Sequence, residues 1–150
     1  MKRWIGVMLA VMAVLGCLTA AATAASKHDE AKGLVKKAVA FLKKNGNEKG
    51  FTEFNNGAGQ FTKGELYIFV IDPKGATLAH GGNQKLIGKN MFELKDSDGK
   101  HFIQDIIKAG KEGGGWTEYK WTNPTSKKIE PKLTYVEPVG DLAVACGFYK

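Results

Sequence analysis

The hydrophobic positions that follow Ser26 repeat with the period of an α-helix. Ser26 and Asp29 fit a capping box, a pattern that opens helices, and Asn45-Gly46 is typical of a helix end. Between these limits apolar residues recur every three or four positions, with lysines on the other side. They are Ala31, Leu34, Val35, Ala38, Phe41 and Leu42. The pattern predicts one long amphipathic helix, then a shorter helical piece over 48–54 and a loop over 55–59.

The period changes at residue 66. The run 66–71, LYIFVI, is continuously apolar and half of it is β-branched, as in a central strand covered on both faces. The segment 72–75, DPKG, has proline and glycine where a turn needs them. A second strand over 77–80 is therefore expected to return antiparallel to the first.

The second half of the chain predicts a helix and then three strands. Residues 101–111 carry apolar positions on one side, and the three glycines at 113–115 end that pattern. The expected strands are 116–122, 128–137 and 141–149, separated by the turn segments NPTS and PVG. Connections this short require antiparallel neighbours. The predicted fold class is α+β: a five-stranded antiparallel sheet with the long N-terminal helix on one face.

The first 25 residues have the parts of a secretory signal peptide. Lys2 and Arg3 precede an apolar run over 4–15, and Ala22-Thr23-Ala24 is a small-residue cleavage site. That run is shorter than the ~20 residues that span a bilayer. We expect cleavage after residue 24 or 25, and a periplasmic domain over 26–150. The alternative is a lipoprotein anchored at Cys17, because the preceding Val14-Leu15-Gly16 resembles a lipobox.

Charge and cysteine content narrow the function classes. The chain holds 22 basic and 15 acidic residues, and Arg3 is its only arginine. Arginine is the preferred residue for bidentate contacts with bases and phosphates, so no nucleic-acid partner is expected. Cys146 is the only cysteine after the predicted leader. It lies in an apolar run and is expected to be a small buried core residue, so the fold must hold without a disulfide.

Catalytic motifs are missing from the sequence. His28, His80 and His101 are scattered without metal-ligand spacing, and no nucleophile turn or phosphate loop occurs. Asp96 and Asp98 resemble the start of a calcium loop, but no glutamate stands at its twelfth position, so a plain turn is expected. We therefore expect no enzyme activity, no cofactor and no metal site.

Aromatic residues and one lysine concentrate on the later strands. Alternation puts Tyr119 and Trp121 on one face of their strand and Trp116 on the other. The next strand carries Lys132 and Tyr135, and the run 66–71 carries a tyrosine. Tyrosine and tryptophan supply apolar wall and hydrogen-bond donors to a small-molecule pocket, and lysine supplies charge for a carboxylate. The alternative is that the aromatic residues are ordinary core and the lysine points to water.

At these residues the chain resembles a known family. It is similar over about 34–150 to the single Cache domain of the second type, an extracytoplasmic ligand-sensing family related to PAS domains. The matching stretches are GELYIFV at 64–70 with Asp72 and Gly75, LAH at 78–80, LIGKN at 86–90, DGK at 98–100, GGGW at 113–116, Tyr119, Trp121, Asn123, Pro124, Lys132, YV at 135–136 and GFY at 147–149.

The resemblance implies a PAS-like sheet that holds a small organic ligand, often a carboxylate, on the face opposite the long helix. The residues it suggests for the ligand site are Tyr67, His80, Trp116, Tyr119, Trp121, Lys132 and Tyr135. Lysine would neutralise the carboxylate, the three tyrosines would donate hydrogen bonds and Trp121 would form a wall. His80 is either a second polar contact or the polar end of its strand. Trp116 falls on the opposite face of an unbulged strand and would then be helix-side core.

Such domains form the outer part of chemoreceptors and sensor kinases. This chain shows no flanking transmembrane segment or output domain, so we expect a stand-alone exported module that binds a ligand for sensing or for delivery to a membrane receptor. The alternative is a structural or interaction module that docks on a partner, or forms a homodimer through the apolar stripe of its first helix. The small residues Ala143, Ala145 and Gly147 share one face of the last strand, and are expected to admit either a helix or a ligand.

Overall fold

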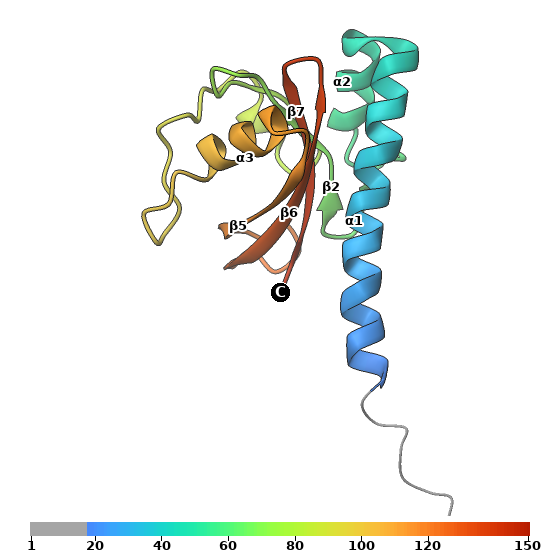
Figure 1. Ribbon diagram of the computed structural model, residues 1–150, viewed down its shortest axis with the longest axis vertical. Helices are drawn as coiled ribbons and strands as arrows, with labels where there is room; N and C mark the ends of the chain where they lie inside the picture. Colours follow the sequence, from blue (N-terminus) through green and yellow to red (C-terminus); the bar gives the residue numbers. More distant parts are fainter. Residues whose placement is uncertain (1–17) are drawn as a thin grey trace, which may run out of the picture.

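The computed structural model describes residues 18–150, with side chains from Ser26 onward (Figure 1). The basic residues, the apolar run and Cys17 of the predicted leader lie outside this part of the chain. Within it, none of the helices is long and apolar enough to cross a membrane. The chain begins with α1 (Leu18–Asn45), turns at Gly46 into α2 (Asn47–Asn55), and continues into the sheet.

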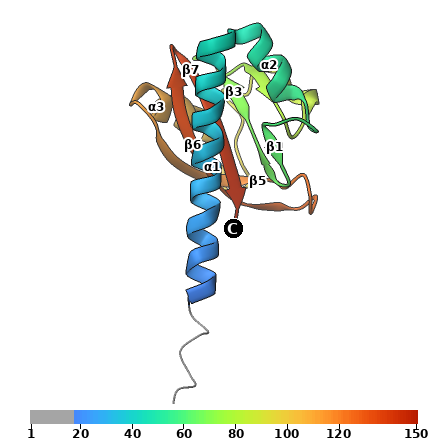
Figure 2. The same cartoon turned by 90° about the vertical axis from the view of Figure 1, so that its right-hand side faces the viewer.

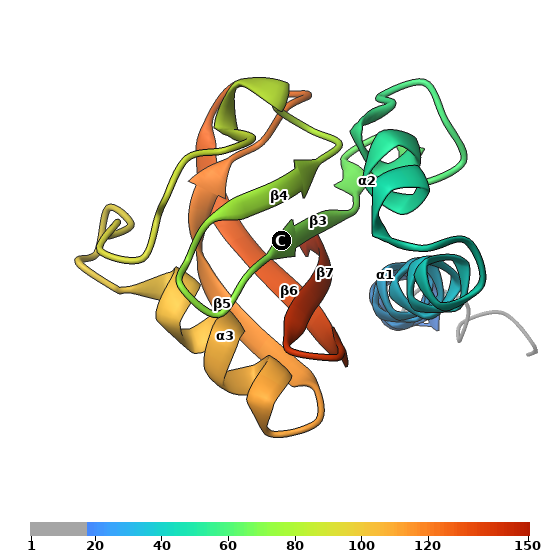
Figure 3. The ribbon, with the colours of Figure 1, turned by 90° about the horizontal axis from the view of Figure 1, so that it is seen from above.

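A five-stranded antiparallel sheet forms the centre of the molecule, as the sequence predicts. Its strands are β3 (Phe69–Ile71), β4 (Thr77–His80), β5 (Gly115–Thr122), β6 (Ile129–Val139) and β7 (Leu142–Tyr149). The spatial order is β4-β3-β7-β6-β5, so the last strand lies in the middle and pairs with both β3 and β6. The β3–β4 and β5–β6 hairpins thus flank a central strand contributed by the end of the chain (Figure 3).

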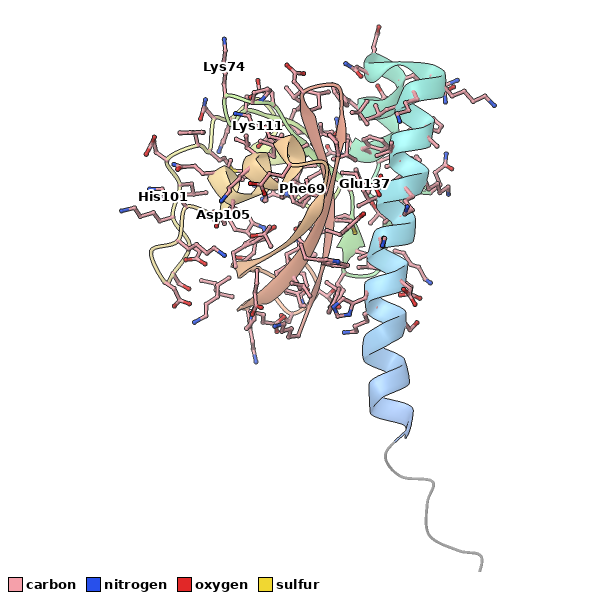
Figure 4. All side chains as sticks on the ribbon, in the orientation of Figure 1. Phe69, Lys74, His101, Asp105, Lys111 and Glu137 are labelled. Atoms are coloured by element: carbon pink, nitrogen blue, oxygen red, sulfur yellow. The ribbon has the colours of Figure 1, made fainter. Side chains whose placement is uncertain are left out.

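Helices cover both faces of this sheet. Helices α1 and α2 pack on one face, and α3 (Phe102–Lys111) with the long connection before it covers the other (Figures 1 and 3). Two hydrophobic clusters correspond to these two faces. Figure 4 shows Glu137 on the α1 side and Phe69 on the α3 side. The connection between β4 and α3 contains the short 3-10 turn η1 (Gln84–Leu86).

The predicted single strand over 66–71 is two strands in the structure. β2 (Leu66–Tyr67) pairs with β1 (Thr62–Lys63) in a separate two-stranded sheet, and only 69–71 join the main sheet. Between them the Ile68 N–H donates to the Phe61 carbonyl at 3.2 Å. The apolar pattern cannot reveal this break, because residues on both sides of it are buried.

The apolar stripe of α1 packs into the hydrophobic core of its own chain. Ala31, Val35, Ala38 and Leu42 are buried against the sheet, and Figure 2 shows α1 crossing that face. The stripe that the sequence offers for a homodimer is therefore not exposed to a second copy. The predicted helix start at Ser26 is wrong: α1 already runs from Leu18, since the alanine-rich segment before Ser26 favours helix.

Candidate functional site

A row of polar and aromatic side chains crosses the α3 side of the sheet. Tyr119 on β5 is the register partner of Lys132 on β6, and Lys132 is in turn the partner of Tyr149 on β7. Residues directly opposite one another across antiparallel strands share a face. Phe102 of α3 stacks on Tyr119 with ring centroids 4.5 Å apart, which identifies that face as the one that α3 covers.

Lys132 is a buried cation in an aromatic enclosure. Its side chain is among the largest fully buried ones, at 1% exposure. Its Nζ donates a hydrogen bond of 2.7 Å to the Tyr67 hydroxyl and stands 4.1 Å from the centre of that ring. The rings of Phe69 and Tyr149 lie at 5.3 and 5.2 Å. Among the described residues no carboxylate is within ion-pair distance of this amine.

Burial without an acidic partner changes the titration of Lys132. Desolvation lowers its pKa to about 7 from the usual 10.5, because the surroundings favour the uncharged amine. Near neutral pH the amine therefore exists in both the charged and the uncharged form, and a nearby negative group shifts this balance. An arriving carboxylate would favour the protonated form.

Tyrosine hydroxyls extend from Lys132 in a hydrogen-bonded chain. The hydroxyls of Tyr67 and Tyr149 lie 3.4 Å apart, and Tyr149 donates to the Thr122 carbonyl at 2.9 Å. Thr134, two residues beyond Lys132 on β6, donates its hydroxyl proton to the Tyr119 hydroxyl at 3.1 Å. Burial raises the pKa of Tyr67 and of Tyr119, and raises that of Tyr149 to about 12. All three stay protonated near neutral pH; the Tyr149 proton is already donated to Thr122, which leaves the hydroxyls of Tyr67 and Tyr119 as donors to an anion.

His80 completes this enclosure from the end of β4. Its ring lies 4.8 Å from that of Tyr67 and stacks on Phe69 at 5.7 Å. Its Nδ1 accepts a hydrogen bond of 2.9 Å from the Asn83 backbone N–H, so the proton of the neutral ring belongs on Nε2. Desolvation, reinforced by nearby Lys132, lowers the pKa of His80 to about 3. The ring is therefore an uncharged donor rather than a second cation.

An open cavity of about 550 Å³ lies next to this group. Tyr67, His80 and Trp121 belong to its lining, as do Thr122 and residues of the η1 segment. Lys132 does not line it. Tyr67 both borders the cavity and accepts the hydrogen bond from Lys132, so this one residue links the cavity to the buried amine.

Five of the seven predicted site residues come together on the α3 side. They are Tyr67, His80, Tyr119, Trp121 and Lys132. Trp121 also packs on Phe102, with ring centroids 5.2 Å apart.

Trp116 and Tyr135 are not part of this group. Both lie on the α1 side: their rings are 5.0 Å apart, and Trp116 also contacts His28 at 4.9 Å. The Tyr135 hydroxyl donates to Glu137 at 2.9 Å. The structure therefore does not bring Tyr135 to the side of the sheet that carries Lys132. The reason is strand alternation, since residues an odd number of positions apart on β6 face opposite sides.

Sequence reasoning missed Phe69, Tyr149 and the role of Gly147. Alternation along the last strand places Tyr149 on the face of the small residues, and this signal could have identified it. Those small residues serve two purposes. Ala143 packs against Gly110 of α3, whereas Gly147 leaves room for Lys132. A Cβ at Gly147 would lie 2.8 Å from Lys132 Cε and 2.7 Å from the Leu133 carbonyl oxygen, closer than side chains pack.

The Gly147→Ala substitution should lower stability by about 1–3 kcal/mol, because backbone atoms cannot move away from the added methyl group. Urea unfolding measures this change. The matched control is Gly33→Ala on the exposed side of α1, where a Cβ meets nothing within 4 Å. That control should raise stability by about 0.5–1 kcal/mol, since alanine favours helix. Equal effects of the two substitutions would contradict the steric role of Gly147.

The Asp96 segment forms the turn that the sequence predicts. The Asp96 carboxylate accepts hydrogen bonds from the backbone N–H groups of Asp98 and Lys100, both at 2.9 Å, and from Lys120 at 3.0 Å. It thereby joins the loop to the free edge of β5. In the part of the chain that the structure describes, no group of three metal-ligating side chains gathers.

Comparisons with known proteins match nearly the whole chain to one family. The family single Cache domain 2 matches residues 6–149. The sensor histidine kinase MctS of Rhizobium johnstonii is 37% identical over 70 residues, which are 47% of this chain and 15% of that kinase. The chain thus spans a small part of the length of this curated relative.

Solved structures share the fold over most of the chain. A methyl-accepting chemotaxis protein from Vibrio parahaemolyticus is 28% identical with a TM-score of 0.72, over 86% of this chain and 92% of that one. A Cache chemosensory domain known for carboxylic acid recognition has a TM-score of 0.73 at 20% identity, over 87% of this chain and 98% of its own. The second likeness concerns the fold alone.

Proposed function

The chain belongs to the single Cache domain 2 family, and from this membership we propose that it is a periplasmic sensor domain for a small carboxylate-bearing metabolite. The family comprises extracytoplasmic ligand-sensing modules, and this agrees with the resemblance that the sequence carries. The ligand, the stand-alone role and delivery to a membrane chemoreceptor or sensor kinase are parts of the proposal.

The buried amine of Lys132 is the observation that supports a carboxylate. A cation that is 1% exposed and has no acidic partner among the described residues is unfavourable by itself. Retaining it makes physical sense if a negative ligand group completes the pair. Aromatic rings around the amine keep water away and strengthen that interaction.

The surrounding side chains fit complementary roles in this proposal. Tyr67 borders the cavity and is already bonded to Lys132, so its hydroxyl would donate to the carboxylate while the lysine supplies charge. Tyr119 offers a further hydroxyl donor on the same face, whereas the Tyr149 hydroxyl donates to Thr122 and contacts the Tyr67 hydroxyl. Trp121 would form the apolar wall, and His80 a neutral polar contact. A solved Cache domain that recognises carboxylic acids has the same fold, which is compatible with this assignment.

Two tryptophans on one strand provide a matched test. Refolded protein, free of carried-over ligand, is screened by thermal shift against short carboxylic acids and the corresponding amines and alcohols, and hits are measured by calorimetry. Trp121→Ala should weaken the binding of a carboxylate about tenfold, because it removes a wall of the cavity. Trp116→Ala should leave the affinity unchanged, because its ring packs on the α1 side.

Two results of these experiments would contradict the proposal. If carboxylates give no shift while the protein refolds normally, the domain is an interaction module and not a carboxylate sensor. Equal loss of affinity in the two tryptophan variants would show that the ligand does not occupy the α3 side.

A further inference from the structure

Two lysines at the mouth of the cavity have no role in the site described so far. Lys85 belongs to η1, and Lys127 to the hairpin loop between β5 and β6; both are exposed and both line the cavity. These two segments lie at the same end of the sheet (Figure 3). The mouth therefore receives a positive charge from each of two segments that are distant in sequence.

The charge at the mouth is uncompensated. Neither the Lys85 amine nor the Lys127 amine forms an ion pair or a hydrogen bond with a described residue, and no acidic side chain lines the cavity. Some other lysines at the surface have acidic partners: Lys120 pairs with Asp98 at 3.0 Å, and Lys150 with Glu118 at 2.7 Å. The cavity thus has lysines at its mouth and Lys132 behind its inner wall, with no acid between.

Lys127 also occupies a backbone position that favours glycine. Its φ is 62°, and among the described residues it is the only one other than glycine with a positive φ. The loop closes through a hydrogen bond of 2.9 Å from the Lys127 N–H to the Asn123 carbonyl. Glycine would adopt this conformation without strain. Backbone strain of this kind often persists at functional sites, where the side chain has a use.

We propose that the ligand is an organic dianion whose second anionic group, a carboxylate or a phosphate, is held at the cavity mouth by Lys85 and Lys127. This inference rests on the proposed carboxylate site and places the first carboxylate at Tyr67 and Lys132. The size of the cavity, about 550 Å³, leaves room for a chain that separates the two groups. Lys85 and Lys127 then determine specificity for dianions over monoanions.

Matched acids of equal chain length test the proposal. Calorimetry compares butyrate with succinate, pentanoate with glutarate and hexanoate with adipate; 3-phosphonopropionate tests whether the outer group is a phosphate-like anion. At least one dianion should bind about tenfold or more tightly than its monoanionic partner, and this advantage should shrink as salt is raised from about 0.05 to about 0.5 M.

The Lys127→Gly variant distinguishes the loss of a ligand-binding charge from a loss of stability. It removes the charge and relieves the positive φ, so the melting temperature should rise by about 2–4 °C. Combined with Lys85→Ala, it should remove the advantage of the dianion and leave the affinity of the monoanion within about twofold. A variant that is more stable yet discriminates less cannot be explained by misfolding.

The possible outcomes distinguish a failure of the dianion inference from a failure of the proposed carboxylate site. If monoanions bind in a Lys132-dependent manner and every dianion binds no tighter, the dianion inference is wrong and the carboxylate site stands. If the double variant keeps the full advantage of the dianion, Lys85 and Lys127 are not its ligands and the inference again fails. If neither monoanions nor dianions bind to the refolded protein, both the inference and the proposed function are wrong.

Discussion

Replacing Lys132 by methionine is expected to weaken carboxylate binding about a hundredfold, the loss that accompanies removal of one partner from a buried charge pair. Methionine matches the lysine stem as far as Cε and remains apolar beside the rings of Tyr67, Phe69 and Tyr149, so the variant removes the amine and its charge with little change of shape. Calorimetric titration with the best acid from the screen measures the change in Kd.

The same substitution should make the unliganded protein more stable at pH 7, by about 1–4 kcal/mol. A buried amine without an acidic partner disfavours folding, and an apolar side chain of similar size removes that penalty. The Tyr67 hydroxyl loses its bond to Nζ but keeps its neighbour, the Tyr149 hydroxyl at 3.4 Å. Urea unfolding of both proteins without ligand gives the difference in free energy of unfolding.

Lys44→Met is the matched control for this pair of effects. Lys44 lies in the last turn of α1 and is exposed, so the control removes the same charge away from the site. Affinity and stability should both stay close to those of the parent. A Lys132→Met protein that binds carboxylates as tightly as the parent would refute the charge assignment, whatever its stability.

Carboxylate affinity should also depend on pH, and should fall up to tenfold per pH unit above about 7, where Lys132 loses its proton. Only the protonated amine attracts the carboxylate, so the apparent Kd rises as the protonated fraction falls. The buried titratable groups around the amine do not change charge in this range: burial holds the pKa of His80 near 3, and raises those of Tyr67, Tyr149 and Cys146.

Calorimetry between about pH 6 and 9 in buffers of different ionisation enthalpy measures both the affinity and the protons taken up. We expect uptake of up to one proton per ligand near and above pH 7. Trp121→Ala should lower affinity without changing the slope with pH, since it leaves the lysine in place. A flat pH profile in the parent protein would contradict the role of Lys132 as the titrating group.

The stability of the unliganded protein should change with pH in the opposite sense. The folded-state pKa of Lys132 is about 7, below the ordinary value of 10.5. Between these values the unfolded chain binds more protons, so stability rises with pH. Below about 7 both states are protonated and the full penalty of the buried charge is present. This rise between pH 7 and 10 should be absent from Lys132→Met.

Local patterns account for most of the architecture. The apolar stripe predicts α1, and the short connections DPKG, NPTS and PVG predict antiparallel neighbours, all of which the structure contains. Two local predictions were wrong for identifiable reasons. The helix continues before Ser26 because alanines favour it, and the run 66–71 divides because the Ile68 N–H bonds to Phe61 outside the main sheet.

The candidate site was less accessible to sequence reasoning. Strand alternation correctly places Trp116 and Trp121 on opposite faces of β5. Applied to β6 and β7, the same rule would have removed Tyr135 from the candidate site residues and added Tyr149 to them. No periodicity reveals that Lys132 is buried, because a strand lysine among polar neighbours ordinarily faces water. Its burial depends on Gly147 across the strand pair and on the rings of Tyr67 and Phe69.

The sequence by itself determined the order of helices and strands, the antiparallel sheet and the family, because these follow from the spacing of nearby residues. Only the tertiary structure decided which side chains meet. It brings Tyr67 to Lys132, 65 positions away, and it brings Lys85 and Lys127 to one cavity mouth. The pKa of Lys132, about 7, arises from that assembly, since desolvation depends on what surrounds a group in space.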